Sequence, residues 1–438
     1  MAFSGSARAD LTTVDGSALD ETGLVDAIRG LEDLKAQAAA AQARLVRELD
    51  AQVRERHRAQ GVRAAQRGRD VAGLVAYARR ESPARGSRFV GFARALVELP
   101  HTTAAMGAGA LSEWRAMLVA RETACLTPAG RAIVDERICA PRADGSYPFE
   151  GWGDRSLVAE TMRQVAAVDP AAVVERRSRA EADRCVSLRP APDVMARLST
   201  LLPATQGVAV WATLSVAADE ARAAGDPRTR GQVMADTLVE RVTGQATADA
   251  VHVTVDLVVS DETLLAGGTA PGWVQGYGPV SAQTADDLVR RAAADVRAAL
   301  RRLYAAPATG ALVAMDSVAR EFPAGLATFL DLRDRTCRTA WCDAPIRHHD
   351  HVVAHADGGE TSGANGQGLC EQCNYIKEAP GWTARPATGP PGGPHVVETR
   401  LPTGHVVTST APGAPAPSRH HARGVETYLS DLIIEWAA

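Results

Sequence analysis

The first third of the chain carries apolar positions three and four residues apart, the spacing of an amphipathic helix. One such pattern begins at Glu21 and continues for roughly 35 residues. Its apolar face is made of Leu24, Ile28, Leu31, Leu34, Ala38, Ala41, Leu45 and Leu49. Shorter helical patterns follow, with breaks at Ser82-Pro83 and at Pro100. The pattern predicts a helical N-terminal part, and the spacing of Trp114 and Met117 places both in its core.

The middle of the chain is also mainly helical by its pattern. One helix is predicted to end near Leu188, two more to lie within residues 191–243, and another to span residues 281–300. The most apolar run, residues 208–217, is interpreted as a buried helix. Residues 251–259 (VHVTVDLVV) are rich in β-branched side chains and predict the strongest strand of this part.

The segments nearer the C-terminus include two predicted hairpins. Residues 302–314 contain Pro and Gly turn signals, and residues 395–409 alternate around a Pro-Thr-Gly turn. A Pro/Gly run at residues 386–394 is interpreted as a linker. Residues 425–438 predict a short apolar helix that is suited to docking or to binding a partner.

Composition places the chain among ordinary globular proteins. Of its 438 residues 46% are hydrophobic, and the formal net charge of −4 gives no global sign of a nucleic-acid binder. No run approaches the roughly 18 apolar residues of a membrane-spanning helix, and no secretion signal is visible. We therefore expect a cytoplasmic protein without membrane association. The basic end of the first helix is interpreted as a solvated face, with a phosphate contact as the alternative: Arg54, Arg56, His57 and Arg58.

The seven cysteines form two close pairs and three scattered positions. Four residues separate Cys337 from Cys342, and two separate Cys370 from Cys373. Under reducing conditions such pairs indicate metal ligands rather than disulfides. The spacing predicts a four-cysteine structural zinc site, with free thiols as the alternative. The scattered cysteines are expected to be buried: Cys125, Cys139 and Cys185.

The segment between the cysteine pairs predicts a hairpin packed on a helix, with the zinc holding its ends together. Residues 347–353 are predicted as a strand that carries Asp350 and His351, and a helix is expected to begin near Asn374. Adjacent strand residues face opposite sides. Asp350 and His351 therefore share one site only if the strand twists or ends there.

These polar residues suit phosphodiester hydrolysis. Histidine is a base at neutral pH, which makes His351 the candidate that activates water. A carboxylate and an amide oxygen suit a hard cation such as Mg²⁺, which makes Asp350 and Asn374 candidate ligands. Asn365 lies in the connecting loop and is expected to bridge backbone groups and hold the strand in register.

Residues 337–377 resemble an HNH endonuclease module in which asparagine replaces the last histidine: CRTAWCDAPIRHHDHVVAHADGGETSGANGQGLCEQCNYIK. Three stretches are similar to a large actinobacterial family that joins a helical N-terminal domain of unknown function to a C-terminal HNH module: LSEWRAMLVARETA, AGDPRTRGQVMADTLVERVTG and FLDLRDRTCRTAWCDAPIRHHDH. The similarity covers most of residues 20–410. It implies hydrolysis of DNA to a 5′-phosphate and a 3′-hydroxyl.

The resemblance also implies roles for single residues. His351 and Asn365 would be the first two motif residues, with His351 as general base. Asp350 and Asn374 would bind a catalytic Mg²⁺ or Mn²⁺, and Lys377 would contact phosphate.

The neighbouring histidines are open to two interpretations. His355 is a candidate phosphate-binding or supporting residue. The alternative is that His348, His349 and His355 are exposed loop histidines.

We therefore expect a metal-dependent DNA endonuclease. One alternative is a non-catalytic zinc module that binds nucleic acid or a protein. Another is that the helical part is a scaffold for a protein partner or a second copy of the chain. Between Asp331 and Glu378 acidic residues outnumber Lys and Arg, so DNA affinity must come partly from the helical part or be weak.

The expected fold class is mostly α, with a large helical N-terminal domain containing a small β element and then a zinc-stapled ββα-metal module. Four segments are predicted: a flexible N-terminus (1–20), the helical domain of unknown function (21–318), the HNH module (319–385), and a linker, hairpin and tail (386–438).

Overall fold

A computed structural model describes residues 16–17, 19–191, 195–248, 257–260, 263, 268–275, 277–293, 316–317, 321–387 and 393–413. In these residues the chain is mostly helical, with small antiparallel sheets and a cluster of four cysteines that could bind a metal. The predicted fold class is therefore confirmed. The predicted hairpin at 302–314, the predicted helix at 425–438 and most of the predicted strand at 251–259 lie outside the described residues.

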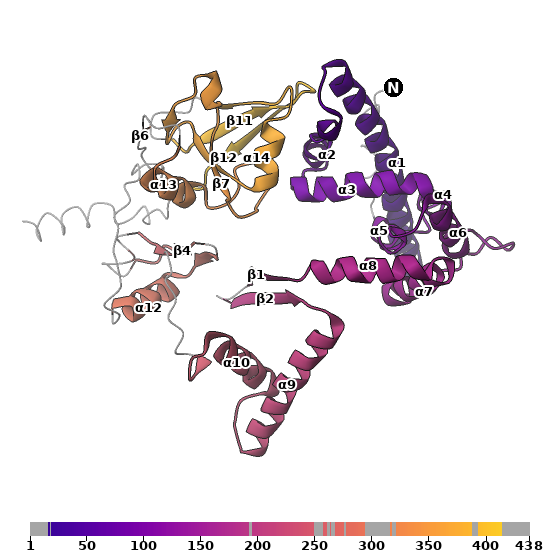
Figure 1. Cartoon of the computed structure of the whole chain (residues 1–438), viewed down its shortest axis with the longest axis horizontal. Coiled ribbons are helices and arrows are strands. Elements are labelled where there is room, and N and C mark those ends of the chain that lie inside the picture. The colour runs from indigo at the N-terminus through magenta and orange to yellow at the C-terminus, as the bar shows by residue number, and fades with distance from the viewer. Residues whose placement is uncertain are drawn as a thin grey trace, which may run out of the picture. The chain divides into compact units, whose positions relative to one another are not determined.

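The chain divides into two compact units, Met1–Ser178 and Arg179–Ala438. The first is a bundle of helices (Figure 1). Its elements are α1 (Glu21–Ala59), η2 (Ala64–Gln66), α2 (Val71–Arg79), α3 (Pro83–Ala95), η3 (Leu96–Glu98), α4 (Pro100–Gly107), α5 (Glu113–Thr123), α6 (Pro128–Cys139), α7 (Asp154–Val168) and the first turns of α8 (Pro170–Ala182).

Local sequence sets where several of these helices begin. Asp20, Ser82, Ser112 and Thr127 each accept a hydrogen bond from a backbone amide in the first turn of α1, α3, α5 and α6 respectively. Such side chains satisfy amides that have no partner inside the helix. The predicted break at Ser82-Pro83 is thus the start of α3.

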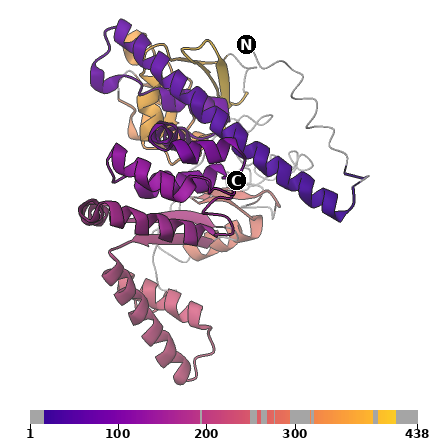
Figure 2. The same cartoon turned by 90° about the vertical axis from the view of Figure 1, so that its right-hand side faces the viewer.

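The second half of α1 packs against α2, α3, α4 and α5 through small apolar side chains. The buried apolar positions are Ala36, Ala39, Ala40, Ala43, Val46 and Val53. The first half extends past the other helices of the unit (Figure 2), and Ile28 there is 62% exposed. The predicted helix is confirmed, but its predicted apolar face is wrong: none of the eight residues assigned to it is buried, and Leu45 in the packed half is 61% exposed.

Two expectations about the first unit are wrong. Trp114 is 57% exposed and donates a hydrogen bond to Asp154 Oδ2 at 2.9 Å, so it is not a core residue. His57 is 1% exposed and accepts a hydrogen bond from the Gly68 amide, so it is not part of a solvated face.

The charges beside His57 are also paired. Arg54 Nε lies 2.8 Å from Asp50 Oδ1, and Arg56 Nη2 lies 3.2 Å from Asp70 Oδ2. These acidic partners come from one turn earlier in α1 and from the loop before α2, so the basic end of α1 is largely neutralised within the unit.

The second unit begins with an antiparallel hairpin and two helices: β1 (Cys185–Ala191), β2 (Met195–Leu201), α9 (Ala204–Ala223) and α10 (Arg230–Thr243). The predicted helix to Leu188 is therefore wrong at its end, because that segment pairs with β2. Cys185 is exposed and Cys125 is half-buried, against the expectation of burial, whereas Cys139 is buried as expected. Trp211 is 66% exposed, so the interpretation of residues 208–217 as a buried helix is wrong as well.

The rest of the second unit consists of short elements, and the cysteine cluster lies among the later ones. They are β3 (Leu257–Val258), β4 (Gly272–Val274), β5 (Gly278–Val280), α12 (Ala282–Ala293), β6 (Asp316–Ser317), α13 (Ala324–Asp334), β7 (His348–His351), η5 (His355–Asp357), β8 (Thr361–Ser362), β9 (Gly366–Leu369), α14 (Glu371–Lys377), β10 (Thr383–Pro386), β11 (Val396–Arg400) and β12 (Val406–Thr410). Strands β11 and β12 form the predicted hairpin and extend to a three-stranded sheet with β10. Among the described residues, no helix has the length and apolar character needed to cross a bilayer.

Candidate metal centre and catalytic site

Strands β7 and β9 and helix α14 form one small ββα unit. The strands pair antiparallel, with His348 opposite Leu369 and His351 opposite Gly366. Helix α14 begins directly after β9, and Cys370 Sγ accepts a hydrogen bond from the Cys373 amide at its first turn. Helix and strand pack together, so side chains of β7 and α14 meet.

The four predicted metal ligands lie together. Cys337, Cys342, Cys370 and Cys373 place their sulfurs within 4.8 Å of one another. Cys342 Sγ lies 3.8 Å from Cys370 Sγ and 3.6 Å from Cys373 Sγ. A tetrahedral zinc with Zn–S bonds of about 2.3 Å sets its sulfurs about 3.8 Å apart. The donor type, number and spacing fit a bound metal such as zinc.

The thiols differ in acidity because they contact one another. A hydrogen bond with Cys342 lowers the pKa of the Cys337 thiol to about 7, and one with Cys337 lowers the pKa of Cys370. The contacts with Cys337 raise the pKa of Cys342 and of Cys373. Four thiolates at this spacing repel one another unless a cation compensates their charge.

Charged residues at the end of α13 connect this cluster to the strands, a feature that the sequence interpretation missed. Arg333 is 4% exposed and donates hydrogen bonds to the carbonyls of Gly363 and Gly366 and to Asp334. Asp334 Oδ2 accepts from the Gly368 amide at 2.8 Å. The acid–base pair thus holds β9 in place. The only sequence signal was the charged run Arg333-Asp334-Arg335, which precedes Thr336 and Cys337.

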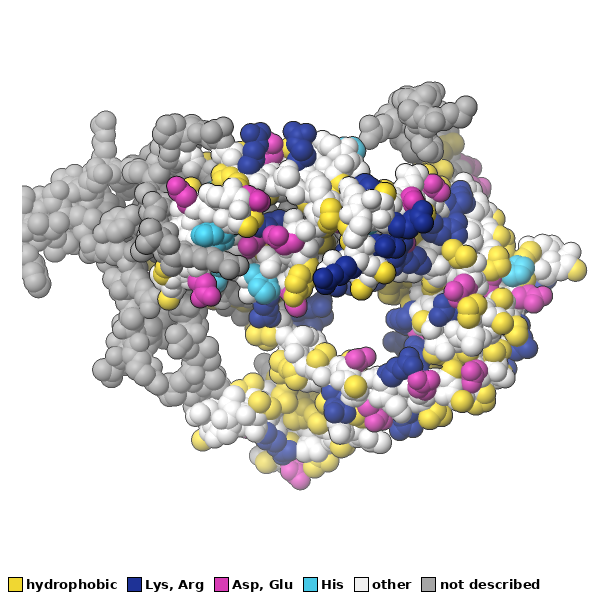
Figure 3. All heavy atoms as spheres, turned by 45° about the horizontal axis from the view of Figure 1, so that its top comes forward, with side chains coloured by type: hydrophobic (Ala, Val, Ile, Leu, Met, Phe, Trp, Pro, Cys, Tyr) yellow, Lys and Arg dark blue, Asp and Glu magenta, His cyan; other side chains and the backbone are white. Residues whose placement is uncertain are grey.

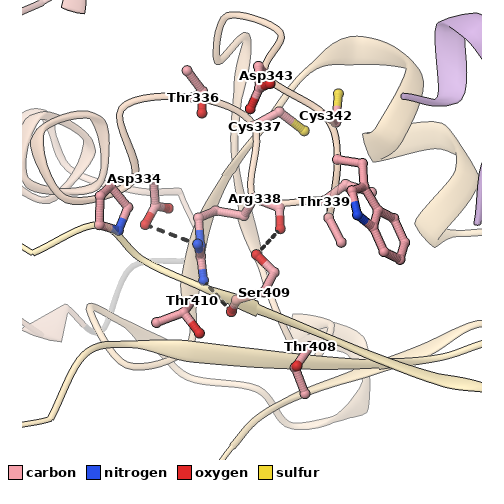
Figure 4. Close-up of a pocket in the computed structure, with 13 residues that line it drawn as sticks. Asp334, Thr336, Cys337, Arg338, Thr339, Cys342, Asp343, Thr408, Ser409 and Thr410 are labelled. Atoms are coloured by element: carbon pink, nitrogen blue, oxygen red, sulfur yellow. Dashed lines mark hydrogen bonds and ion pairs between the residues drawn. The ribbon is translucent and has the colours of Figure 1, made fainter. Parts of the chain in front are cut away.

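A cleft of about 420 Å³ lies between the first cysteine loop and β12 (Figure 4). Arg338 forms its wall, with Nη2 donating to the carbonyls of His395 and Ser409 and with Nε 3.5 Å from Asp334 Oδ1. Ser409 Oγ in turn donates to the Arg338 carbonyl. None of the predicted catalytic residues lines this cleft. The hydrogen bonds between Arg338 and Ser409 attach β12 to the loop that carries Cys337 and Cys342.

Asp350 faces helix α14. Its Oδ2 lies 2.6 Å from Lys377 Nζ, and the same ammonium donates a hydrogen bond to the His351 carbonyl at 2.6 Å. Lys377 therefore contacts the strand that was predicted to carry the catalytic residues. Asn374 lies one helical turn before Lys377, which places both on one face of α14.

His351 faces the opposite side of the strand. Its Nε2 forms a hydrogen bond of 2.8 Å with Thr361 Oγ1 of β8, and the ring is 8% exposed. The rings of Phe322 and His355 lie beside it, with centroids at 4.7 and 5.5 Å. The expectation that neighbouring strand residues diverge is met here: Asp350 turns to α14 and His351 to β8.

Asn365 bridges the loop between the two strands, as predicted. Its Oδ1 accepts a hydrogen bond from the Val353 amide, and its Nδ2 donates to the carbonyls of Val353 and Glu360. The loop closes tightly at Gly359, where a Cβ atom would lie 1.9 Å from the Val353 oxygen. Asn365 thus sets the chain direction directly after His351.

The other histidines divide between the two interpretations. His355 is exposed but lies against the His351 ring. His349 belongs to β7 and forms a hydrogen bond of 2.8 Å with Asp331 Oδ1, so it is not a loop residue. Histidines and acidic side chains are interspersed on the face drawn in Figure 3.

Comparison with known families matches the larger part of the chain to one family. Residues 26–334 match the family described as "Domain of unknown function (DUF222)". The match ends with the last residue of α13, before the first of the four cysteines. Comparisons with curated proteins and with solved structures gave no match. Because the matched residues make up well over half of the 438, the chain belongs to the DUF222 family.

Proposed function

We propose that the C-terminal ββα unit is a metal-dependent DNA endonuclease of the HNH class. The observation that carries this proposal is the position of Asp350 and His351 where β7 ends: Asp350 contacts Lys377 of α14, and His351, the last residue of the strand, contacts Thr361. Asn365 braces the loop that follows. Residue types, order along the chain and the ββα arrangement agree with the motif that the sequence resembles.

His351 is the proposed general base. Its Nε2 forms a hydrogen bond of 2.8 Å with Thr361 Oγ1. This contact fixes the imidazole in one orientation on the same strand as Asp350, a proposed cation ligand. Burial between Phe322 and His355 restricts the ring to this orientation and thus holds the base ready for water.

Asp350 and Asn374 are the proposed ligands of a divalent cation. Oxygen ligands of this kind suit Mg²⁺ or Mn²⁺. Asp350 Oδ2 is buried and forms an ion pair of 2.6 Å with Lys377 Nζ, so this oxygen faces a positive charge in the structure. A cation there would stabilise the charge that develops on the phosphate and on the leaving oxygen.

The direct test is cleavage of supercoiled plasmid DNA by the zinc-loaded full chain with Mg²⁺ or Mn²⁺. We expect the wild type to cleave and His351→Ala to be inactive. His405→Ala is the matched control, because His405 is exposed in the turn between β11 and β12 and belongs to neither β7, β9 nor α14. Its activity should equal that of the wild type.

Two results would count against the nuclease. Equal cleavage by the wild type and His351→Ala would show a contaminant or a different base. DNA binding without cleavage, with the metal cluster loaded, would favour the non-catalytic binding module.

A further inference from the structure

We infer that the ammonium of Lys377 and the catalytic cation compete for the same oxygens. Lys377 occupies the cation position when no cation is bound, and cation binding displaces it. The inference rests on the cation site of the proposed function and adds a step that controls access to it.

The surroundings of the ammonium are made of oxygen atoms. Lys377 Nζ lies 2.6 Å from Asp350 Oδ2, 2.6 Å from the His351 carbonyl oxygen and 3.2 Å from Glu378 Oε1. Two carboxylates and a backbone carbonyl are the donor types that hard divalent cations select. Asp350 Oδ2, a proposed ligand of the cation, is therefore held by the ammonium in this structure.

The contact with Asp350 is an ion pair. Asp350 Oδ2 is buried, and the ammonium of Lys377 lies 2.6 Å away. A lysine ammonium acts as a compact point charge. In this position it replaces the charge of a cation without requiring directed bonds from the carboxylate.

Both cations cannot be held at once. The Lys377 side chain is 12% exposed and that of Asp350 is 23% exposed, so water screens their charges only in part. A divalent ion bound to Asp350 Oδ2 would repel an ammonium at the same oxygen. The flexible lysine side chain can leave, whereas Asp350 is fixed in β7.

Displacement gives Lys377 a second role. Once released, its ammonium lies beside the cation site and can reach a phosphate oxygen of the substrate. Cation binding and phosphate binding would then be coupled through one side chain. This reconciles the phosphate contact expected from the sequence with the ion pair seen in the structure.

The chain is suited to a direct test because it contains only two lysines, Lys35 and Lys377. Lys35 is exposed, with 71% of its side chain accessible, and pairs with Glu32 of the same helix, so it serves as an internal reference. The zinc-loaded full chain is acylated with an amine-reactive ester at increasing Mg²⁺, and both lysines are followed by mass spectrometry. Mg²⁺ is chosen because it prefers oxygen ligands and is therefore not expected to displace zinc from the cysteine thiolates.

We expect the acylation rate of Lys377 to rise about tenfold with Mg²⁺. A tenfold change corresponds to the free energy of about one hydrogen bond to a charged group, which the ammonium loses when it leaves Asp350. The rate at Lys35 should stay constant. In Asp350→Asn, Lys377 should react rapidly without Mg²⁺ and show no response to it. An unchanged Lys377 rate in the wild type would overturn the inference.

A second measurement uses Mg²⁺ binding by calorimetry. Lys377→Met removes the charge but keeps a straight side chain suited to a helix, and it should bind Mg²⁺ about tenfold more tightly than the wild type. Equal or weaker binding, or no binding by either protein, would refute the competition. Zinc content and circular dichroism confirm that each variant is folded.

These readouts are independent of DNA cleavage. If Mg²⁺ exposes Lys377 but no DNA is cut, the competition stands and the nuclease proposal fails. If Mg²⁺-dependent cleavage occurs while Lys377 stays protected, the nuclease stands and the competition fails.

Discussion

The hydroxyl of Thr361 lies 2.8 Å from Nε2 of His351, and both side chains are buried. The two residues belong to different strands, β7 and β8, which are not paired with each other. The contact therefore depends on the loop that Asn365 braces. It connects the proposed base, His351, to Thr361, a residue that the sequence motif does not single out.

Replacing Thr361 by valine should lower the cleavage rate and leave substrate affinity unchanged. Valine keeps the shape but cannot hold Nε2 of His351, so kcat is expected to fall about tenfold, the scale of one hydrogen bond, while KM is unaffected. Steady-state cleavage of a short DNA duplex measures both constants. Thr361→Ser should retain most of the rate, and equal kcat in all three proteins would show that Thr361 does not position the base.

Removing a cysteine of the cluster should remove the metal. Wild-type protein is expected to contain about one tightly bound zinc per chain, since four thiolates form a closed structural site. Cys373→Ser should lose this metal and the ordered ββα unit. Metal analysis and the dispersion of amide signals measure both effects. Cys185→Ser is the control, because Cys185 is exposed in β1 and outside the cluster; loss of zinc in that variant would argue against the site.

Replacing Asn365 by aspartate should loosen the loop after His351. The change keeps the acceptor for the Val353 amide but removes the two donors that bond Val353 and Glu360 carbonyls. Each lost buried bond costs about 1–3 kcal/mol. Hydrogen exchange of the amides near Val353 should accelerate at least about tenfold, since tenfold corresponds to 1.4 kcal/mol. Asn374→Asp, in a half-buried helical position, should leave this exchange unchanged.

Asp135 should stabilise the first turn of α4 by accepting hydrogen bonds from its backbone amides. Leu99 offers no side-chain cap there, and Asp135 of α6 accepts hydrogen bonds from the amides of His101 and Thr102 and from the Thr102 hydroxyl. Burial raises the pKa of this carboxyl despite those bonds. Asp135→Ala should destabilise α4 by about 1–3 kcal/mol, because buried amides lose their acceptor.

Hydrogen exchange of the α4 amides measures that loss. The neighbouring Glu136→Ala, an exposed position, should leave the exchange rates unchanged. Similar rates in wild type and Asp135→Ala would mean that water replaces the cap without cost.

His395 should remain neutral in mildly acidic solution. Burial, with the nearby Arg333 charge, lowers the pKa of its imidazole to about 4, and its Nε2 bonds the Ala364 carbonyl. In the unfolded chain a histidine takes up a proton near pH 6.5. The unfolded state therefore binds more protons between pH 6.5 and 4, and the stability contributed by neutral His395 is complete above 6.5 and falls as the pH drops.

The imidazole signals in an NMR titration test this directly. One signal, identified by its disappearance in His395→Gln, should show no titration between pH 8 and 5. A midpoint near 6.5 for that signal would contradict the burial of the ring.

The sequence by itself determined the local features of this protein. The apolar period marked where α1 begins, the breaks at Ser82-Pro83 and Pro100 marked the starts of α3 and α4, and paired cysteines at short spacing marked a metal cluster. These features depend on side chains that act within a few residues, so their signal is contained in the sequence. The alternation around Pro402 likewise marked the β11–β12 hairpin.

Only the tertiary structure decided which faces are covered and which distant residues meet. Hydrophobic runs do not identify their partners, which is why the run at 208–217 was wrongly interpreted as buried and why β1 was missed. The cap that Asp135 provides to α4, the pair Arg333–Asp334 that holds β9, and the hydroxyl of Thr361 all act on groups ten or more residues away. The ion pair of Lys377 with Asp350 belongs to the same class, because a contact between a strand and a helix exists only after both have packed.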